Sequence, residues 1–291
     1  MKSQTIRVGD LSFHTENFGD RSGKPCLLIA GAMAPGRLWT DAFCQKLVSA
    51  GFFVVRYDHR DIGESSGVDW KKEPYTLCDL ANDAKGILDG YEIKKAHFVG
   101  HSMGGYVCQW IALQFPERVR SMTAIGAGPI GATAETDLPL TAQEQTILDR
   151  TWKILLGRKD GATLEETIQN FLPVWQYLNG EYLLDEKMAT AYTRDLITRS
   201  RHPIRMGGNH ELLMANLNLE KHRDILRNIT TPFLLIHGEE DFLCLSRNAR
   251  ALAHAIPNNT LVMIPKMGHM LFHTALEEKI AQLVISRGVV A

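Results

Sequence analysis

Residues 100–105 read Gly-His-Ser-Met-Gly-Gly and stand between a short apolar run, 96–99, and a segment of helical periodicity that opens near Gly104. The pattern Gly-x-Ser-x-Gly between a strand and a helix predicts a sharp turn with Ser102 at its tip. The glycines leave room for the strand and the helix to approach closely, while the serine takes a strained backbone. We therefore expect the serine hydroxyl to project above the sheet, beside the N–H of Met103, at a helix N-terminus that favours negative charge.

Strands and helices alternate on both sides of this turn. Short apolar runs predict strands buried on both faces, and a hairpin signal at Gly9-Asp10 precedes them. Such alternation predicts an α/β fold with a mostly parallel sheet flanked by helices. The expected strands are 5–8, 11–16, 25–30, 52–57, 96–99, 121–125, 232–236 and 260–264, and the expected helices are 38–49, 76–90, 104–115, 246–256 and 275–286.

The segment 130–225 interrupts the alternation, because it is helix-like and more polar and contains no convincing strand. We expect it to form a helical cap (lid) domain, inserted into a core domain made of 1–129 and 226–291. Within it, Gly207-Gly208-Asn209-His210 is interpreted as a hinge or turn near the pocket. Ligands of open α/β sheets bind beyond the carboxyl ends of the strands, so candidate residues are sought there.

Composition narrows the class of protein. The 291 residues include 32 Lys+Arg and 33 Asp+Glu, a net charge of -1, which argues against a nucleic-acid partner or a polybasic membrane-binding surface. Five cysteines without a C-x-x-C pair predict reduced thiols and a cytoplasmic location. We expect no signal peptide, because no apolar run follows the charged N-terminal residues. We expect no transmembrane helix, because no stretch reaches 18 apolar residues. Metal and dinucleotide motifs are missing, so we expect no cofactor and no metal, in a monomer or homodimer.

A serine hydroxyl becomes a nucleophile when a histidine, itself held by a carboxylate, removes its proton. His269 follows the strand 260–264 at the correct end of the sheet, and Asp241 follows the strand 232–236. The resulting chain order is Ser, Asp, His. Alternative residues remain for both roles, namely His273 as the base and Glu239 or Glu240 as the acid.

These segments together resemble the α/β-hydrolases that carry a cap domain, over essentially the whole chain. The residues that carry the resemblance are Gly100 to Gly105, His237-Gly238 with Asp241, and Gly268-His269. The resemblance implies an eight-stranded, mostly parallel sheet with the cap inserted after strand six. It implies Ser102 as nucleophile, Asp241 as acid and His269 as base. Serine at the elbow speaks against dehalogenase and epoxide-hydrolase chemistry, since those relatives use aspartate there.

The resemblance also implies an oxyanion hole made of two backbone N–H groups. One belongs to Met103, and the other comes from the loop 30–36, where most relatives have His-Gly and this chain has Ala30-Gly31. By position the second donor is Ala32. Met33 remains an equal alternative, because backbone groups of either residue could serve.

A further stretch, Asp58-His59-Arg60-Asp61, together with the unusual loop 30–36, is similar to the corresponding segments of polyketide (anthracycline) methyl esterases. The chain as a whole also resembles cofactor-free haloperoxidase-type hydrolases. We expect Asp58, Arg60 and Ser65 to stabilise the turn by local hydrogen bonds.

The function that these residues indicate is a serine hydrolase acting on a small or medium carboxylic ester, a small-molecule substrate. Thioesters, lactones, C–C bonds and peracid formation stay open with the same three residues, and so does a ligand receptor on a hydrolase scaffold. Candidates for the substrate pocket are Met33, His101, Trp152 and Trp175; the two tryptophans could equally form the core of the cap.

Overall fold

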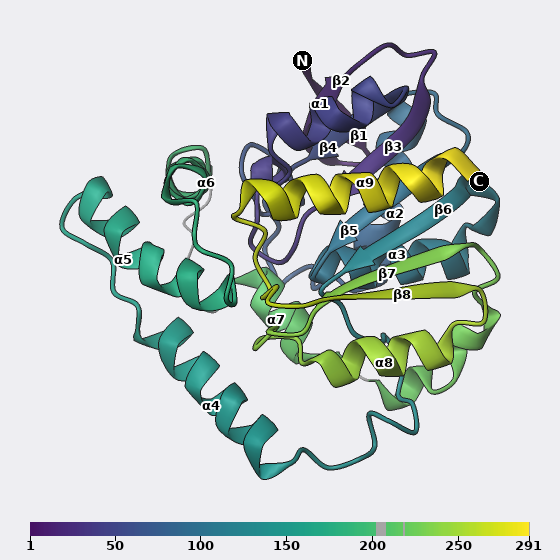
Figure 1. Ribbon diagram of the computed structural model, residues 1–291. Helices are drawn as coiled ribbons and strands as arrows, with labels where there is room; N and C mark the ends of the chain where they lie inside the picture. The colour runs from purple at the N-terminus through teal and green to yellow at the C-terminus, as the bar shows by residue number, and fades with distance from the viewer. Residues whose placement is uncertain (202–207, 218, 291) are drawn as a thin grey trace.

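A single eight-stranded sheet organises the molecule (Figure 1). The computed structural model describes residues 1–201, 208–217 and 219–290. The strand order is β1-β2-β4-β3-β5-β6-β7-β8, antiparallel from β1 through β2 to β4 and parallel from there on. This confirms the predicted fold class. The strands are β1 (Lys2–Val8), β2 (Leu11–Phe18), β3 (Lys24–Ile29), β4 (Phe52–Tyr57), β5 (Ala96–His101), β6 (Val119–Ile125), β7 (Phe233–Gly238) and β8 (Asn259–Ile264).

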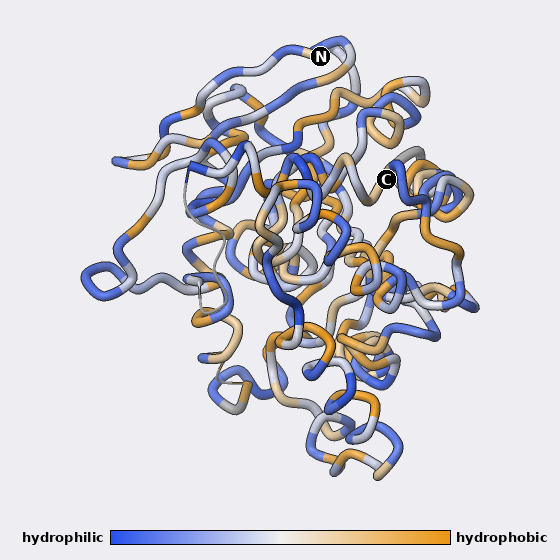
Figure 2. The backbone as a smooth tube through the Cα atoms, turned by 90° about the vertical axis from the view of Figure 1, so that its left-hand side faces the viewer, coloured by the Kyte–Doolittle hydropathy of each residue, from blue (hydrophilic) through white to orange (hydrophobic). Residues whose placement is uncertain are grey.

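Helices cover both faces of the sheet and form two separate apolar cores. One core packs α2, α3 and α8 against the sheet, and the other packs α1 and α9 against its opposite face. Orange and blue alternate along the coiled segments in Figure 2, as expected of amphipathic helices. The helices of the core are α1 (Asp41–Ser49), α2 (Leu77–Gly90), α3 (Met103–Gln114), α8 (Ser246–Ala255) and α9 (Thr274–Val290).

Several element boundaries differ from the sequence-based expectation. The helix expected from residue 38 begins at Asp41, because Thr40 caps it by accepting the Phe43 N–H at 3.0 Å, and residues 36–38 form a separate 3₁₀ turn. The strand expected from residue 121 already begins at Val119. The last helix, expected over 275–286, spans Thr274–Val290 and passes through Gly288.

Among the described residues, four α-helices lie between β6 and β7, in the segment where a cap is predicted. They are α4 (Ala142–Gly157), α5 (Leu164–Leu178), α6 (Glu186–Thr198) and α7 (Asn209–Ala215). In Figure 1, α4, α5 and α6 stand apart from the sheet, while α7 lies close to it. We call residues 130–225 the insert; its boundaries as a domain stay a prediction. The expected hinge at 207–210 lies partly outside the described residues, because Gly207 is not among them.

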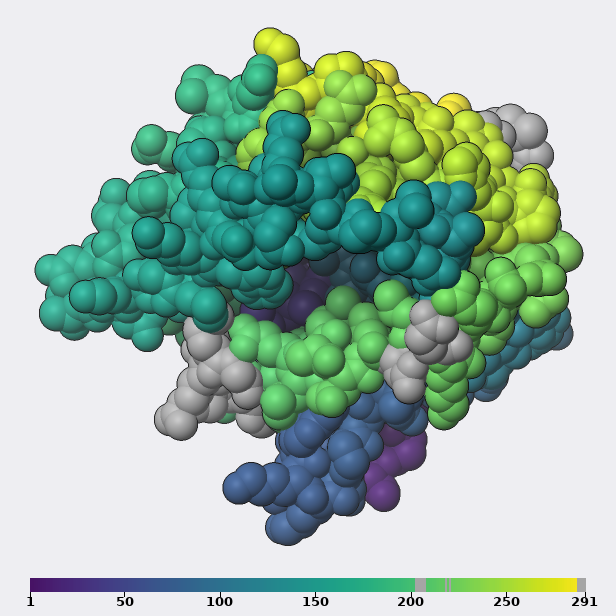
Figure 3. Space-filling view, turned by 90° about the horizontal axis from the view of Figure 1, so that it is seen from below, coloured from purple at the N-terminus to yellow at the C-terminus, as the bar shows by residue number. Residues whose placement is uncertain are grey.

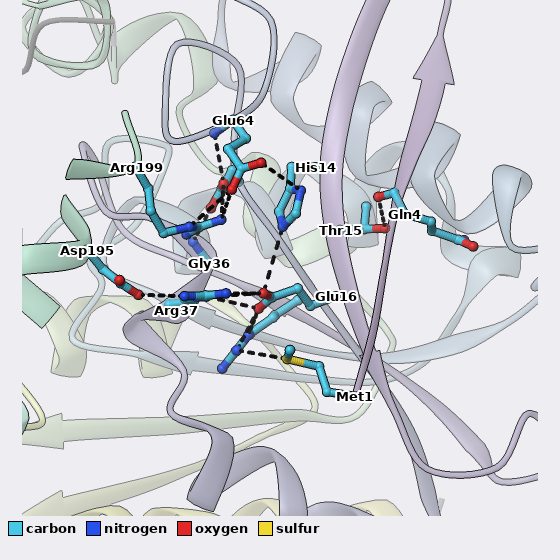
Figure 4. Close-up of polar contacts among 12 residues, drawn as sticks. Met1, Gln4, His14, Thr15, Glu16, Gly36, Arg37, Glu64, Asp195 and Arg199 are labelled. Atoms are coloured by element: carbon cyan, nitrogen blue, oxygen red, sulfur yellow. Dashed lines mark hydrogen bonds and ion pairs between the residues drawn. The ribbon is translucent and has the colours of Figure 1, made fainter. Parts of the chain in front are cut away.

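A network of ion pairs, buried at Glu16 and Arg56, joins the sheet to the insert (Figure 4). Glu16 on β2 accepts hydrogen bonds from Arg56 Nε at 2.7 Å and from Arg37 Nη2 at 2.7 Å. Arg37 also reaches Asp195 of α6, at 3.1 Å. Burial alone would raise the pKa of Glu16, but hydrogen bonds from His14 and Arg37 and the charge of Arg56 hold that pKa well below its usual range. The carboxylate is therefore ionised, and it fixes two arginines at once.

We predict that Glu16→Gln lowers the free energy of unfolding by about 3 kcal/mol near neutral pH, because it removes the buried carboxylate that pairs with Arg56 and leaves that guanidinium only the exposed carboxylate of Asp41. The folded-state pKa of Glu16 is depressed, so its stabilisation is present above the unfolded-state pKa and is lost as pH falls through the lower folded-state value. The difference between variant and wild type should therefore shrink below about pH 4. Urea unfolding at a series of pH values measures it.

The control is Glu278→Gln, which breaks an exposed ion pair with Lys46 and should cost less than about 1 kcal/mol. A cost of Glu16→Gln that stays constant down to pH 3 would contradict the assignment of a charged Glu16.

Candidate active site

Ser102 occupies a strained turn between β5 and α3. Its φ of 52° and ψ of −120° lie in a region that side-chain-bearing residues rarely adopt. Two glycines make the turn possible: a Cβ on Gly100 would overlap the Gly104 carbonyl, and one on Gly104 would lie 2.7 Å from the Ala30 oxygen. The close approach of strand, helix and loop thus fixes the serine, whose side chain stays partly accessible.

Asp241 and His269 form a buried hydrogen-bonded pair. His269 Nδ1 lies 2.8 Å from Asp241 Oδ2, while Oδ1 accepts the N–H groups of Leu243 and Cys244 at 3.0 and 2.8 Å. Burial would raise the pKa of Asp241, but the charge and hydrogen bond of His269 outweigh it and keep that pKa below its usual value. An ionised Asp241 accepts a hydrogen bond from the Nδ1–H of His269. The lone pair on Nε2 of His269 is therefore free to act as a base.

Two more histidines form hydrogen bonds with backbone carbonyls at or near this pair. His101 Nε2 donates to the His269 carbonyl at 2.7 Å, and His237 Nε2 donates to the Cys244 carbonyl at 2.7 Å. Burial, with the neighbouring His269, lowers the pKa of His101 to about 3, and burial also lowers the pKa of His237. Both rings are therefore neutral near physiological pH and serve as donors that position backbone groups.

Gly126, just after β6, lies against the Asp241–His269 pair. Its φ is +61°, and a Cβ there would lie 3.3 Å from Asp241 Oδ2 and 3.4 Å from His269 Nδ1. Both the backbone conformation and the space favour glycine at this position.

The loop 30–36 runs beside the serine. A Cβ on Gly31 would lie 3.1 Å from the Ser102 Cβ. The Ala34 N–H closes a turn onto the Gly31 carbonyl at 3.3 Å, with Met33 in a left-handed conformation at φ 58°. Among the residues that the structure describes, the Ala32 N–H meets no acceptor, whereas the Met33 N–H donates to His210 Nδ1 at 3.0 Å.

The tetrapeptide 58–61 anchors this loop. Asp58 Oδ1 accepts the Gly36 N–H at 2.8 Å, and His59 Nε2 donates to the Ala30 carbonyl at 3.1 Å. The Ser65 hydroxyl donates to the Asp58 carbonyl at 2.6 Å, which agrees with local turn stabilisation. Arg60, in contrast, pairs with Asp83 of α2 at 2.6 and 2.7 Å, so its guanidinium ties the loop to a helix rather than to the turn itself.

The tetrapeptide also contacts the insert. Asp58 Oδ2 lies 3.3 Å from Arg199 Nη2, and Asp61 Oδ2 accepts a hydrogen bond from Asn209 of α7 at 2.9 Å. Sequence reasoning missed His59 and His210 as neighbours of the loop. The sequence places 207–210 near the pocket as a hinge or turn, whereas Asn209 and His210 open helix α7. No periodic or motif signal indicated which groups of the loop either histidine contacts.

The predicted pocket residues occupy different environments. Trp152 on α4 is 50% exposed, whereas Trp175 on α5 is buried, donates to Thr193 Oγ1 at 2.8 Å and stacks on Phe171. His101 is buried, and Met33 is partly accessible. Figure 3 shows a hollow between teal atoms of the insert and the green segment that follows them, with purple atoms of the N-terminal part of the chain on its floor. Which residues line the substrate pocket stays a prediction.

The alternative acid and base residues lie elsewhere. Glu239 is exposed, and the His273 ring packs against Tyr182 at 5.0 Å between centroids. Within residues 1–201, 208–217 and 219–290, no group of three or more potential metal ligands comes together. No helix in the same ranges has the length and apolar character needed to cross a membrane.

Comparisons with known proteins agree on one family. A family model described as alpha/beta hydrolase fold matches residues 24–276. The chain is 32% identical over 282 residues to a rhodomycin D methylesterase (DnrP) of Streptomyces peucetius, covering 93% of each protein. It is 28% identical to a putative carbamate hydrolase (RutD) of Pseudomonas syringae, covering 88% of this chain and 91% of that protein. An esterase structure from Exiguobacterium antarcticum superposes with a TM-score of 0.75 at 18% identity, covering 99% and 100% of the two chains.

We predict that Gly126→Ala destabilises the protein by about 1–2 kcal/mol, the usual cost of a left-handed residue with a Cβ. It should also disturb the Asp241–His269 hydrogen bond, because the new methyl group touches both side chains. Thermal unfolding measures the first effect, and the low-field proton NMR signal of the His269 Nδ1–H measures the second.

Two control glycines separate the effect of backbone strain from the effect of the contact with Asp241 and His269. Gly51 has a φ of +86° and Gly157 has no positive φ, and a Cβ on either would meet nothing within 4 Å. Gly51→Ala should therefore lower stability without moving the NMR signal. Gly157→Ala, at the end of α4, should neither lower stability nor move the signal. An unchanged signal in Gly126→Ala would refute the contact.

Proposed function

This chain belongs to the α/β-hydrolase family, and on that premise we propose that it is a serine hydrolase that cleaves a small or medium carboxylic ester. The observation that carries the proposal is the buried hydrogen bond of 2.8 Å between His269 Nδ1 and Asp241 Oδ2. It leaves Nε2 of His269 as a base, in a fold whose strained elbow presents Ser102.

In the proposed mechanism, Ser102 Oγ attacks the ester carbonyl while His269 Nε2 takes the hydroxyl proton. The resulting imidazolium is stabilised by the ionised Asp241 and then protonates the leaving alcohol. The acyl group stays on Ser102 as an ester. Water then attacks this acyl-enzyme while His269 removes its proton, which releases the carboxylic acid and restores the serine.

The developing oxyanion needs two backbone donors. We assign them to Ala32 and Met103. Met103 is the first residue of α3, where an N–H has no acceptor within its own helix. The Ala32 N–H meets no acceptor among the described residues, whereas the Met33 N–H is already bonded to His210. These contacts favour Ala32 over Met33.

The relatives support a substrate class for the proposal. The name of the rhodomycin D methylesterase that matches at 32% identity supports a methyl ester, cleaved to an acid and methanol. A panel of methyl, ethyl and longer alkyl esters, with a thioester, a lactone and a diketone beside them, separates this preference from the other reactions that the same three residues support.

We predict that Ser102→Ala lowers kcat by several orders of magnitude, because it removes the attacking atom, while the thermal unfolding curve stays nearly unchanged. In the wild type, a fluorophosphonate probe should label Ser102 stoichiometrically, as mapped by mass spectrometry. Retained turnover in the alanine variant would refute the nucleophile. A folded wild type that binds esters without turnover or labelling would favour the receptor alternative.

We predict that Asp241→Asn lowers kcat by roughly 10⁴, because the amide no longer accepts the Nδ1 proton and the imidazole turns to the wrong tautomer. Glu239→Gln and Glu240→Gln are matched controls that remove a neighbouring carboxylate, and each should keep its activity. Steady-state kinetics on one ester measures all three. A larger loss in either glutamine variant than in Asp241→Asn would transfer the acid to that residue.

A further inference from the structure

His210 uses both nitrogens of its ring between the insert and the loop 30–36. Nδ1 accepts the Met33 N–H at 3.0 Å, and Nε2 donates to the Arg60 carbonyl at 3.0 Å. Because an N–H donor faces one nitrogen and a carbonyl faces the other, the ring is neutral with its proton on Nε2. The side chain is buried, although it comes from α7, 177 positions away from Met33.

The hydrogen bond to His210 is made by Met33, the residue of the loop 30–36 whose backbone conformation is strained. Met33 is left-handed without being glycine, a conformation that persists only where the surroundings fix it. The Met33 N–H and the Ala32 N–H belong to adjacent peptide planes that meet at the Ala32 Cα. Holding one plane therefore limits the direction in which the other N–H points.

We propose that His210 is a positioning residue of the oxyanion hole: it accepts the Met33 N–H and so keeps the Ala32 N–H free and directed toward the substrate oxygen. This inference rests on the proposed function, since it presupposes an oxyanion bound at Ser102. It assigns to the insert a part in the chemistry as well as in covering the site.

The surroundings keep His210 in the accepting state. Burial lowers the pKa of His210 to about 4, and the positive charge of Arg60 adds to this, while the bond to the Arg60 carbonyl opposes it. The other groups against the ring are His59 and Tyr75, whose rings meet it edge-on at 5.7 and 6.3 Å. Near neutral pH no proton competes with the Met33 N–H for Nδ1.

A purely structural role would be to fill the space between His59 and Tyr75. Two substitutions separate this from positioning. His210→Asn places an oxygen near the former Nδ1, so it keeps an acceptor for Met33 and loses the donor to Arg60. His210→Gln reaches the former Nε2 position, so it keeps the donor and loses the acceptor. Both remove the imidazole ring.

We expect His210→Gln to lower kcat by roughly 10- to 100-fold, somewhat less than the loss of an oxyanion donor itself, with KM changed less than about twofold. His210→Asn should stay within about threefold of wild-type kcat. The affinity of a trifluoromethyl ketone, which forms a tetrahedral adduct with the serine, should fall in parallel with kcat/KM. Thermal unfolding is measured for each variant, and kcat is compared at a temperature where all are folded.

Equal losses in the two variants that follow their stability would show that His210 only fills space, and unchanged kinetics in both would refute the inference outright. Fluorophosphonate labelling of wild-type Ser102 is the accompanying control. Labelled wild type with unaffected variants overturns only the role of His210, whereas unlabelled, inactive wild type overturns the proposed function and this inference with it.

Discussion

The close approach of backbone at the elbow is the constraint on which the rest of the site depends. Strand β5, helix α3 and the loop after β3 meet so tightly that Gly100 and Gly104 have no room for a side chain. This packing forces Ser102 into its strained conformation and brings Gly31 against the serine. The donors proposed for the oxyanion and the proposed nucleophile are thus placed by one steric contact, before any polar interaction contributes.

Polar contacts then refine what the packing provides. Three histidines around the site each donate a hydrogen bond to a backbone carbonyl. They are His101, His237 and His59, and the last of these holds the start of the loop 30–36. Burial keeps their rings neutral, so they orient groups without adding charge near Asp241. Compared with these three histidines, His269 is the one that combines a hydrogen bond to a carboxylate with a second nitrogen that meets no partner among the described residues.

The sequence predicted the features that short motifs or periodicity encode. The sheet, the elbow and the position of the insert follow from apolar runs and glycine spacing, and the structure pairs Asp241 rather than Glu239 or Glu240 with His269. Contacts between distant segments left no such signal, so His210 beside Met33 was missed. The exposure of Trp152 was equally unpredictable, because an aromatic residue at helical spacing looks the same whether it faces a pocket, a core or solvent.

Two helices of the insert, α4 and α6, differ in how they are attached to the core. Helix α6 and its C-cap are held by ion pairs through Asp195 and Arg199. Helix α4 has one buried residue, Thr151, among its described positions, and an ion pair between Glu144 and Arg247 also joins it to the core. Most of α4 can therefore change in sequence without disturbing the sheet or the elbow. Over evolutionary time, this helix can therefore vary while the residues around the elbow and the Asp241–His269 pair stay the same, and it is a natural segment to randomise in a library that must preserve the fold.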